Sequence, residues 1–475
     1  ALALPAQAGF LAARLSAALV TALGALALAR LSRATGWLTP LWFVAFLFLQ
    51  PFFTAHAATA MTEPYAAALV AWGLLAFVER RWLVLAVVAA LMPLARMESL
   101  AFWPFVLAAL IHARAWRFAL LLPLPLLIWN LLGSLSNGDL LWLLHQSNWR
   151  IYPERASLHY VRSYAWVAGL GLFVPIAVGI LAPHLPGSRR VPPVEPEMET
   201  ARRRARLSST VVAVVFLVVY TALAVWHPIT FGNLRYFAYA APAFALLAAA
   251  GIHTLVGRRT GAGWISLGLL LPGAALLWNH PLIGDFGIPR RLDLLPLAAV
   301  LLWLALYAQP PRVRVLAPLL AVLLGTFGLI RNNMGTLHHE PSPEHAAVER
   351  AARMLADPLP GDAVFYGAHP VLAFHRGTNP YDRESYPAVT DRLPDTAPRG
   401  SVFLWDSHYA MRKGRSLELR AFLGKRSWRY LGGVISSDSV WAGAFFERWT
   451  ESPPDSGAVP PPPPALLEGS LTEAT

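Results

Sequence analysis

The sequence contains no cysteine in 475 residues, and lysine occurs only at Lys413 and Lys425. The lack of cysteine excludes disulfide bonds and thiol chemistry. Charged residues make up only 14% of the chain, whereas about a quarter is usual in a soluble domain. The sequence has neither a P-loop nor a Rossmann fingerprint. Nothing in it therefore supports nucleotide-driven transport or the use of a nucleotide-linked substrate.

Apolar residues dominate the composition of the chain. Hydrophobic residues form 56% of the chain, and the mean hydropathy is +0.47. A backbone in lipid must satisfy its own hydrogen bonds, and an α-helix does so within one segment. The composition therefore predicts a helical integral membrane protein. Its richness in Ala, Leu, Pro and Arg is typical of a GC-rich bacterial coding sequence.

Arginine is concentrated in every second loop between the apolar segments. These loops hold Arg30, Arg33, Arg80, Arg81, Arg114, Arg117, Arg189, Arg190, Arg202, Arg203, Arg204, Arg206, Arg258, Arg259, Arg312 and Arg314. This is the positive-inside pattern, which indicates that these loops are cytoplasmic. The pattern accounts for the net charge of +12, so we expect no nucleic-acid partner.

The apolar runs predict about 12 transmembrane helices. The predicted spans are Gly9–Leu31, Pro40–Ala55, Pro64–Val78, Trp82–Ala95, Ser99–His112, Phe118–Leu132, Ala165–Ala182, Ser208–Trp226, Tyr236–Val256, Ala262–Trp278, Leu292–Ala308 and Val315–Ile330. Several are shorter than the roughly 20 residues that a perpendicular span needs, so the hairpins around Glu63 and Arg96 are expected to be broken or re-entrant. The Arg-rich loop Gly187–Leu207 is expected to be flexible.

With the Arg-rich loops inside, both ends of the chain are predicted to lie outside. An outside N-terminus without a signal sequence predicts that at least one span precedes Ala1. The outer loops are then Gly133–Tyr164, His227–Arg235 and Asn279–Arg291.

The composition changes after Arg331. A helix is predicted over Glu344–Ala356 and another over Leu417–Leu423. Short β-like runs are Ala363–Tyr366, Ser401–Trp405 and Tyr430–Ile435. The fold class is therefore an all-α polytopic membrane protein with a small C-terminal α/β domain outside the cytoplasm. The predicted domains are 1–331 in the membrane, 332–450 periplasmic or extracellular, and a Pro-rich disordered tail over 451–475.

Two hairpins carry charged residues at the predicted outer face. Glu63, in Met61-Thr62-Glu63-Pro64, is either a buried carboxylate that acts as a base or the first turn of a helix capped by Thr62. Arg96, in Ala95-Arg96-Met97-Glu98-Ser99, either pairs with Glu98 or faces a phosphate. At Glu63 both readings can hold at once.

Arg235 lies in Phe231-Gly232-Asn233-Leu234-Arg235-Tyr236, at the outer boundary of a later span. A guanidinium there suits bidentate phosphate binding, although it can also reach to the lipid headgroups. Aromatic, amide and charged residues in the loop Leu144–Tyr164 suit sugar recognition, or equally an interfacial aromatic belt. The side chains expected to contact substrate are His56, Glu98, His145, Trp149, Arg150, Tyr152, His227 and Tyr236.

No metal or cofactor is expected. The histidines of the C-terminal region have no zinc-like spacing, and no cysteine assists them. We therefore expect no divalent metal.

Three short stretches together resemble a known family. They are Met61-Thr62-Glu63-Pro64, Ala95-Arg96-Met97-Glu98-Ser99-Leu100 and Phe231-Gly232-Asn233-Leu234-Arg235-Tyr236, followed by Pro242. With an α/β domain after the last span, this layout resembles the bacterial membrane glycosyltransferases of the GT-C class, akin to protein O-mannosyltransferases and aminoarabinose transferases. The resemblance covers most of the chain, through motifs that are each short.

The resemblance implies a glycosyltransferase in the bacterial inner membrane. It implies inverting transfer of a sugar from a polyprenyl-phosphate donor at the outer face to a glycan, lipid or protein acceptor. Arg235 and Arg96 would hold the donor phosphate. The family's acidic catalytic residue follows the first span, and this sequence starts at what corresponds to the second. Glu63 is therefore the candidate base within this chain.

Two other functions fit the same composition. About 12 spans are common in transporters, so a transporter or flippase of lipid-linked or small solutes is one alternative. A non-catalytic membrane scaffold whose C-terminal domain binds a partner is the other. Against a transporter, the polar residues collect at one face and the two halves show no sequence similarity.

Overall fold

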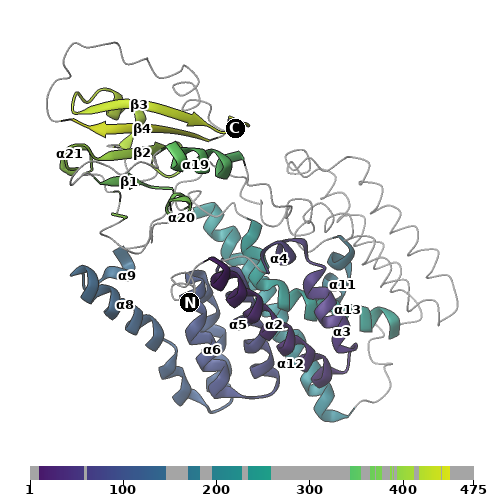
Figure 1. Cartoon of the computed structure of the whole chain (residues 1–475). Helices are drawn as coiled ribbons and strands as arrows, with labels where there is room; N and C mark the ends of the chain where they lie inside the picture. Colours follow the sequence, from purple (N-terminus) through teal and green to yellow (C-terminus); the bar gives the residue numbers. More distant parts are fainter. Residues whose placement is uncertain are drawn as a thin grey trace. The chain divides into compact units, whose positions relative to one another are not determined.

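The computed structural model describes residues 10–57, 61–145, 170–181, 195–226, 234–257, 343–354, 364–369, 371–376, 386–387, 389, 393–410, 417–439 and 441–449. The chain forms two compact units, Ala1–His338 and His339–Thr475 (Figure 1). The predicted spans at 262–330, and the tail from residue 451, lie outside the described residues.

The first unit is helical. Its elements are α2 (Phe10–Thr35), α3 (Pro40–Phe48), α4 (Pro51–His56), α5 (Glu63–Val78), α6 (Trp82–Ala95), η1 (Met97–Phe102), α7 (Trp103–His112), η2 (Trp116–Leu121), α8 (Leu124–Asn137), α9 (Trp142–His145), α11 (Leu170–Leu181), α12 (Pro196–Trp226), η5 (Leu234–Ala240) and α13 (Ala241–Gly257). Within the described part of the chain, four segments are long and apolar enough to cross a membrane: Ala12–Thr35, Trp116–Leu135, Pro196–Ala222 and Tyr236–Thr254. Shorter apolar helices cover Glu63–Val78, Trp82–Ala95 and Met97–His112.

Proline explains why one predicted span is wrong. The run Pro40–Ala55 was expected to be continuous, but it forms α3 and α4 with Leu49 and Gln50 between them. Pro51 cannot donate a backbone hydrogen bond and disfavours helical geometry at the residue before it. The Gln50 side chain instead donates to the carbonyl of Phe46 at 3.0 Å and to that of Ala241 at 2.8 Å. The break thus fixes α3 against α13.

The Arg run before residue 207 is helical, so the prediction of a flexible loop is wrong from Pro196 onward. Helix α12 starts at Pro196 and has Glu197 and Glu199 in its first turn. Proline suits the first helical position, and acidic side chains suit the positive end of the helix dipole. The side chain of Arg203 also pairs with Glu199 one turn earlier, at 3.2 Å. Local sequence therefore extends the helix beyond its apolar part.

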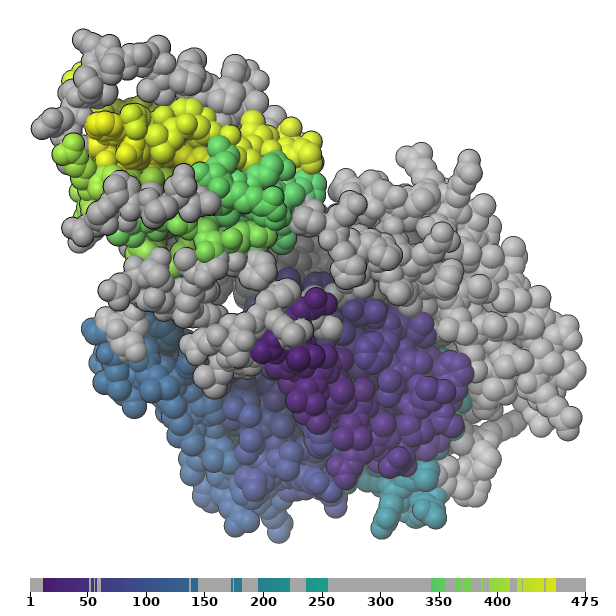
Figure 2. Space-filling model, viewed as in Figure 1, coloured from purple at the N-terminus to yellow at the C-terminus, as the bar shows by residue number. Residues whose placement is uncertain are grey.

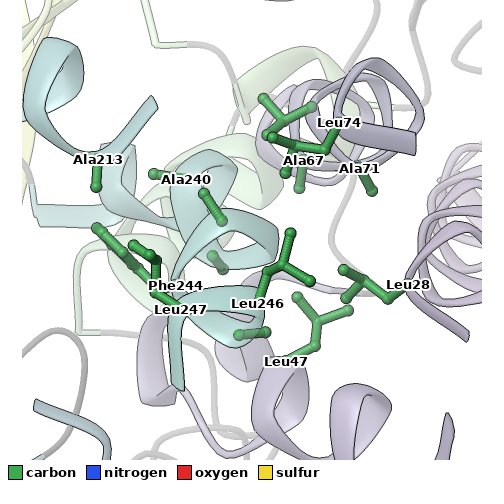
Figure 3. Packing of buried hydrophobic residues seen from close by; sticks show 14 of the residues in the cluster. Leu28, Leu47, Ala67, Ala71, Leu74, Ala213, Ala240, Phe244, Leu246 and Leu247 are labelled. Carbon is green, nitrogen blue, oxygen red and sulfur yellow. The ribbon is translucent and has the colours of Figure 1, made fainter. Parts of the chain in front are cut away.

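Helix α13 forms the centre of the helical core. Phe244, Leu246 and Leu247 are fully buried and meet side chains of α2, α3, α5 and α12 (Figure 3). Two glycines bring α13 close to α11. A Cβ at Gly251 would lie 1.8 Å from the carbonyl oxygen of Pro175, and one at Gly179 would lie 2.1 Å from that of Leu247. Glycine is therefore required where these two helices cross.

Apolar side chains also cover the outside of this unit. On α8 (blue in Figure 2), Leu127, Leu131 and Leu135 are each more than half exposed. On α2, Leu15 and Leu19 are exposed to a similar degree. An apolar surface of this kind is expected where helices face lipid.

The second unit is a small α/β fold. Its elements are α19 (Pro343–Met354), β1 (Phe365–Gly367), α20 (Leu372–His375), α21 (Leu393–Thr396), β2 (Val402–Asp406), α22 (Leu419–Leu423), β3 (Trp428–Ile435) and β4 (Ala442–Arg448). The four strands lie in the order β1-β2-β4-β3, with β1 parallel to β2 and the other pairs antiparallel. The three predicted strands are present with shifted ends, and β4 is an addition.

Strand β2 is buried on both faces. Val402 and Leu404 pack on the side of α19, whereas Phe403 and Trp405 pack with Phe422 of α22. This alternation follows from the two-residue repeat of a strand. The sheet is thus sandwiched between helices, and α19 and the yellow strands β3 and β4 form one continuous surface (Figure 2).

Candidate functional site

A cluster of three charged side chains lies at one end of the α5–α6 hairpin. Glu63 begins α5, Arg96 follows α6 directly, and Glu98 lies in η1. An Arg96 Nη1 lies 3.5 Å from Glu63 Oε1, and Nη2 donates to Glu98 Oε1 at 2.9 Å. Because α5 and α6 are antiparallel neighbours, the start of one and the end of the other meet at the same place. The predicted pairing of Arg96 with Glu98 is confirmed, and the structure adds Glu63, which the sequence predicted separately.

Tyr236 closes the cluster from a distant part of the chain. Its ring in η5 lies under the guanidinium of Arg96, 4.1 Å from the guanidinium carbon to the ring centroid. Tyr220 of α12 packs beside Tyr236, with 5.6 Å between ring centroids, and Phe216 stacks on Tyr220 at 4.4 Å. A cation over an aromatic face is attracted by the ring quadrupole. The aromatic side chains therefore form a base on which Arg96 lies.

The cluster is largely shielded from solvent. The side chain of Glu63 is 2% exposed, that of Arg96 12% and that of Glu98 17%. One guanidinium faces two carboxylates, so Arg96 is fully engaged electrostatically. Its Nε nevertheless has no hydrogen-bond partner among the described residues, and neither has the buried hydroxyl of Ser99. The cluster is therefore a buried ion-pair network that contains two donors, Arg96 Nε and Ser99 Oγ, with no partner among the described residues.

Only some of the other predicted site residues lie in the described part of the structure. His56 ends α4, which packs against η5 and thus near Tyr236. His145 ends α9, and Arg235 lies in η5, but their side chains are outside the described part of the structure. Trp149, Arg150, Tyr152 and His227 lie wholly outside it. Their roles, and the phosphate role of Arg96, stay predictions.

The Arg-rich segments gather at the opposite end of the helices. Arg202 Nε donates to the carbonyl of Thr35 at 2.7 Å, and an Nη of Arg204 donates to that of Val78 at 3.4 Å. The Arg206 guanidinium carbon lies 5.7 Å from the ring centroid of Trp37.

The ends of α2 and α5 therefore meet the basic start of α12. Glu63 and Arg96 lie at the other ends of α5 and α6, so the two charged regions are separated by the length of these helices.

A second polar cluster lies in the α/β unit, and it contains two of the C-terminal histidines for which the sequence predicted no metal site. His369 follows the end of β1 by two residues, and His408 follows the end of β2 by two residues. Since β1 and β2 are parallel neighbours, their carboxyl ends place the two histidines side by side. Nε2 of His369 lies 2.9 Å from Glu344 Oε1, and Nδ1 of His408 lies 3.1 Å from the same oxygen.

The hydrogen bonds around His369 determine which of its ring nitrogens carries the hydrogen. Its Nδ1 accepts the backbone N–H of Val371 at 3.2 Å, so Nε2 carries the hydrogen that is donated to Glu344. Nearby, the fully buried Asp406 accepts the backbone N–H groups of His408 and Tyr409. Among the described residues, no three His, Asp or Glu side chains are arranged to hold a metal ion. The cluster therefore joins α19 to the two strand ends.

Glu344 is expected to make this unit sensitive to acid. Partial burial raises the pKa of its carboxyl, but the hydrogen bonds from His369 and His408 outweigh this and hold the pKa well below its usual range. A depressed carboxyl pKa contributes stability that is present above the unfolded value of about 4.3 and is lost as the pH falls below it. Glu344→Gln should therefore lower the free energy of opening that protects the β2 amides from hydrogen exchange. The expected decrease at pH 7 is about 1.5–3 kcal/mol, the usual size for hydrogen bonds to a charged group.

Hydrogen exchange with mass spectrometry of peptides covering 402–406, at pH 7 and pH 3, measures this effect in the full chain. The difference between wild type and Glu344→Gln should shrink at pH 3. Glu349→Gln is the matched control, since it lies on the same helix and pairs with Arg353, which is 76% exposed. A Glu349→Gln effect as large as that of Glu344→Gln would contradict the assignment.

No protein-family model and no curated protein sequence matches the chain. Two solved structures resemble it. The structure of ArnT from Cupriavidus metallidurans in the apo state matches 91% of this chain and 83% of that chain, with a TM-score of 0.49 and 13% identity. The structure of ArnT from the same organism bound to undecaprenyl phosphate matches 83% of this chain and 78% of that chain, with a TM-score of 0.44 and 15% identity. At identities and scores this low, the function has to be inferred from the chain's own side chains.

Proposed function

We propose that this chain is a bacterial inner-membrane glycosyltransferase of the GT-C type, which moves a sugar from a polyprenyl-phosphate donor to an acceptor. One observation carries the proposal. The three separate stretches on which the sequence resemblance rests, at 61–64, 95–100 and 231–236, supply Glu63, Arg96 and Tyr236, which converge in one buried cluster.

In the proposed reaction, a carboxylate takes the proton of the acceptor hydroxyl. The acceptor oxygen forms a bond to the anomeric carbon of the sugar, and the bond from that carbon to the phosphate oxygen breaks. Polyprenyl phosphate leaves with the bonding electrons, and attack from the opposite side inverts the anomeric centre. Glu63 is the proposed base, because it is the most deeply buried carboxylate of the cluster.

The leaving phosphate needs a cation to stabilise its charge. Arg96 already shares its charge between Glu63 and Glu98. We therefore assign the larger part of phosphate binding to Arg235, which lies next to Tyr236 in η5, and assign to Arg96 the positioning of Glu63. No metal or cofactor is required in this scheme, because arginine supplies the positive charge.

The proposed orientation puts the Glu63 cluster at the periplasmic face and the Arg-rich helix ends in the cytoplasm, following the positive-inside rule. The α/β unit is proposed to be periplasmic as well, and the acceptor to be a glycan, lipid or protein of the cell envelope. Mannose or another hexose is the sugar class that the resemblance favours.

Transfer in detergent separates this proposal from its alternatives. The purified chain would be given radiolabelled polyprenyl-phosphate sugars and an envelope extract as acceptor. A transferase releases polyprenyl phosphate and labels the extract even in micelles, where no two compartments exist. Movement of the lipid-linked sugar across proteoliposomes without any transfer in detergent would instead indicate a flippase. If the chain neither transfers nor transports any sugar of the donor panel, the result would favour a scaffold.

A further inference from the structure

The helical unit contains an apolar groove with a basic end. Its volume is about 850 Å³, and it is lined by α5, α6, η1, α7 and α12. Most lining side chains are aliphatic or aromatic, and Phe105 and Leu207 are 47% and 60% exposed, so the groove is open at its side. An apolar groove that opens at the side of a helical membrane protein suits the acyl chain of a lipid.

The polar lining residues lie at one end of this groove. They include Arg80, Arg114 and Arg204, together with His112 and Ser208, and none of the described lining residues is acidic. Arg80 and Arg204 are close enough for their like charges to act on one another. No ion pair is formed by any of these three arginines among the described residues, whereas the neighbouring Arg81 pairs with Glu79 at 2.8 Å. The groove end thus carries positive charge that no described carboxylate neutralises.

Arg80 and Arg114 occupy equivalent and unusual backbone positions. Each follows the end of a helix and has a left-handed conformation, with φ of 59° and 58°. In each turn the next residue donates back across the helix end, from Arg81 to the carbonyl of Ala76 and from Ala115 to that of Leu110, both at 2.8 Å. Glycine is the usual residue at this position of such a turn. The positive-inside rule explains arginine in these loops but not its use at the one position of each turn where glycine is easier.

We propose that this groove binds an anionic phospholipid of the surrounding membrane. The phosphate lies between Arg80, Arg114 and Arg204, and an acyl chain lies along the apolar lining toward Met92 and Phe102. The three guanidinium groups complement the charge and the hydrogen-bond acceptors of a phosphodiester. The phosphate-binding end of the groove lies at the end of α5 opposite Glu63, so the phosphate site is separate from the proposed base.

Thermal unfolding of the full, delipidated chain in neutral detergent tests the proposal. Phosphatidylglycerol should raise Tm by about 5 °C, a shift typical of a saturating ligand for a protein of this size. Phosphatidylcholine should produce little change, because it lacks net negative charge, and inorganic phosphate at equal ionic strength should produce none, because it lacks the acyl chain.

The double variant Arg80→Gly/Arg114→Gly separates binding from structure. Glycine relieves the left-handed strain, so Tm without lipid should not fall and is expected to rise, while the response to phosphatidylglycerol should be lost. Arg30→Gln/Arg33→Gln is the control, since it removes the same charge from α2, which contributes no residue to the groove. This variant should respond like the wild type.

Three outcomes would overturn the proposal. One is a phosphatidylglycerol response that persists in Arg80→Gly/Arg114→Gly. Another is an equal response to phosphatidylcholine or to inorganic phosphate. The third is stabilisation by polyprenyl phosphate but not by phosphatidylglycerol, which would assign the groove to the carrier lipid of the proposed reaction.

Discussion

Glu63→Gln is expected to lower sugar transfer by about 10²–10⁴-fold, the range for loss of a general base. Glutamine has nearly the same shape and can still accept a hydrogen bond from Arg96, so the cluster should keep its packing. It cannot take the proton of the acceptor hydroxyl. The measurement is the initial rate of polyprenyl phosphate release in detergent, with donor and acceptor saturating.

Glu79→Gln is the matched control, because Glu79 follows the other end of the same helix and pairs there with Arg81. It should transfer sugar at the wild-type rate. Glu98→Gln shows which carboxylate acts, since Glu98 shares Arg96 with Glu63. Full activity in Glu63→Gln together with inactive Glu98→Gln would assign the base to Glu98. Full activity in both would remove this cluster from the reaction.

Arg96→Leu is expected to destabilise the helical unit by about 3–5 kcal/mol, the usual cost of breaking a buried ion pair by removing one partner. Glu63 and Glu98 would face each other without a cation, and Tyr236 would lose the guanidinium over its ring. Unfolding of the purified chain in mixed micelles with increasing denaturing detergent measures the change.

The triple variant Glu63→Gln/Arg96→Leu/Glu98→Gln should recover most of that loss, because no unpaired charge remains. Arg203→Gln is the control, since the Arg203 side chain is 81% exposed and its pair with Glu199 should contribute no more than about 1 kcal/mol. If Arg96→Leu cost no more than Arg203→Gln, the cluster would not be a buried electrostatic contact in the folded protein.

The sequence was sufficient for the helices that obey local rules. Trp82–Ala95 was predicted with its observed ends, and α5 begins one residue earlier than expected. Each helix begins next to a charged residue or a proline and ends at a charged residue, so the sequence itself marks where the helix starts and stops. The same reasoning failed at Pro51, where a proline inside an apolar run divides the predicted span.

Strand β4 shows why part of the α/β unit was missed. Its sequence starts Ala-Gly-Ala, which has low strand propensity, and it lies between β2 and β3 with both faces buried. A strand of this kind has no polar–apolar alternation to detect. Only its hydrogen-bonded partners make it a strand, and those come from other parts of the sequence.

The sequence by itself determined the apolar helices, the segregation of arginine and the residue types available for chemistry, because these depend on composition and short-range pattern. Only the tertiary structure decided which of those residues meet. Tyr236 lies 140 positions after Arg96, and His408 lies 64 positions after Glu344, yet each pair is in contact. Such contacts depend on how helices cross and how strands are ordered. Those arrangements are set by packing, as at Gly179 and Gly251, and no local pattern encodes them.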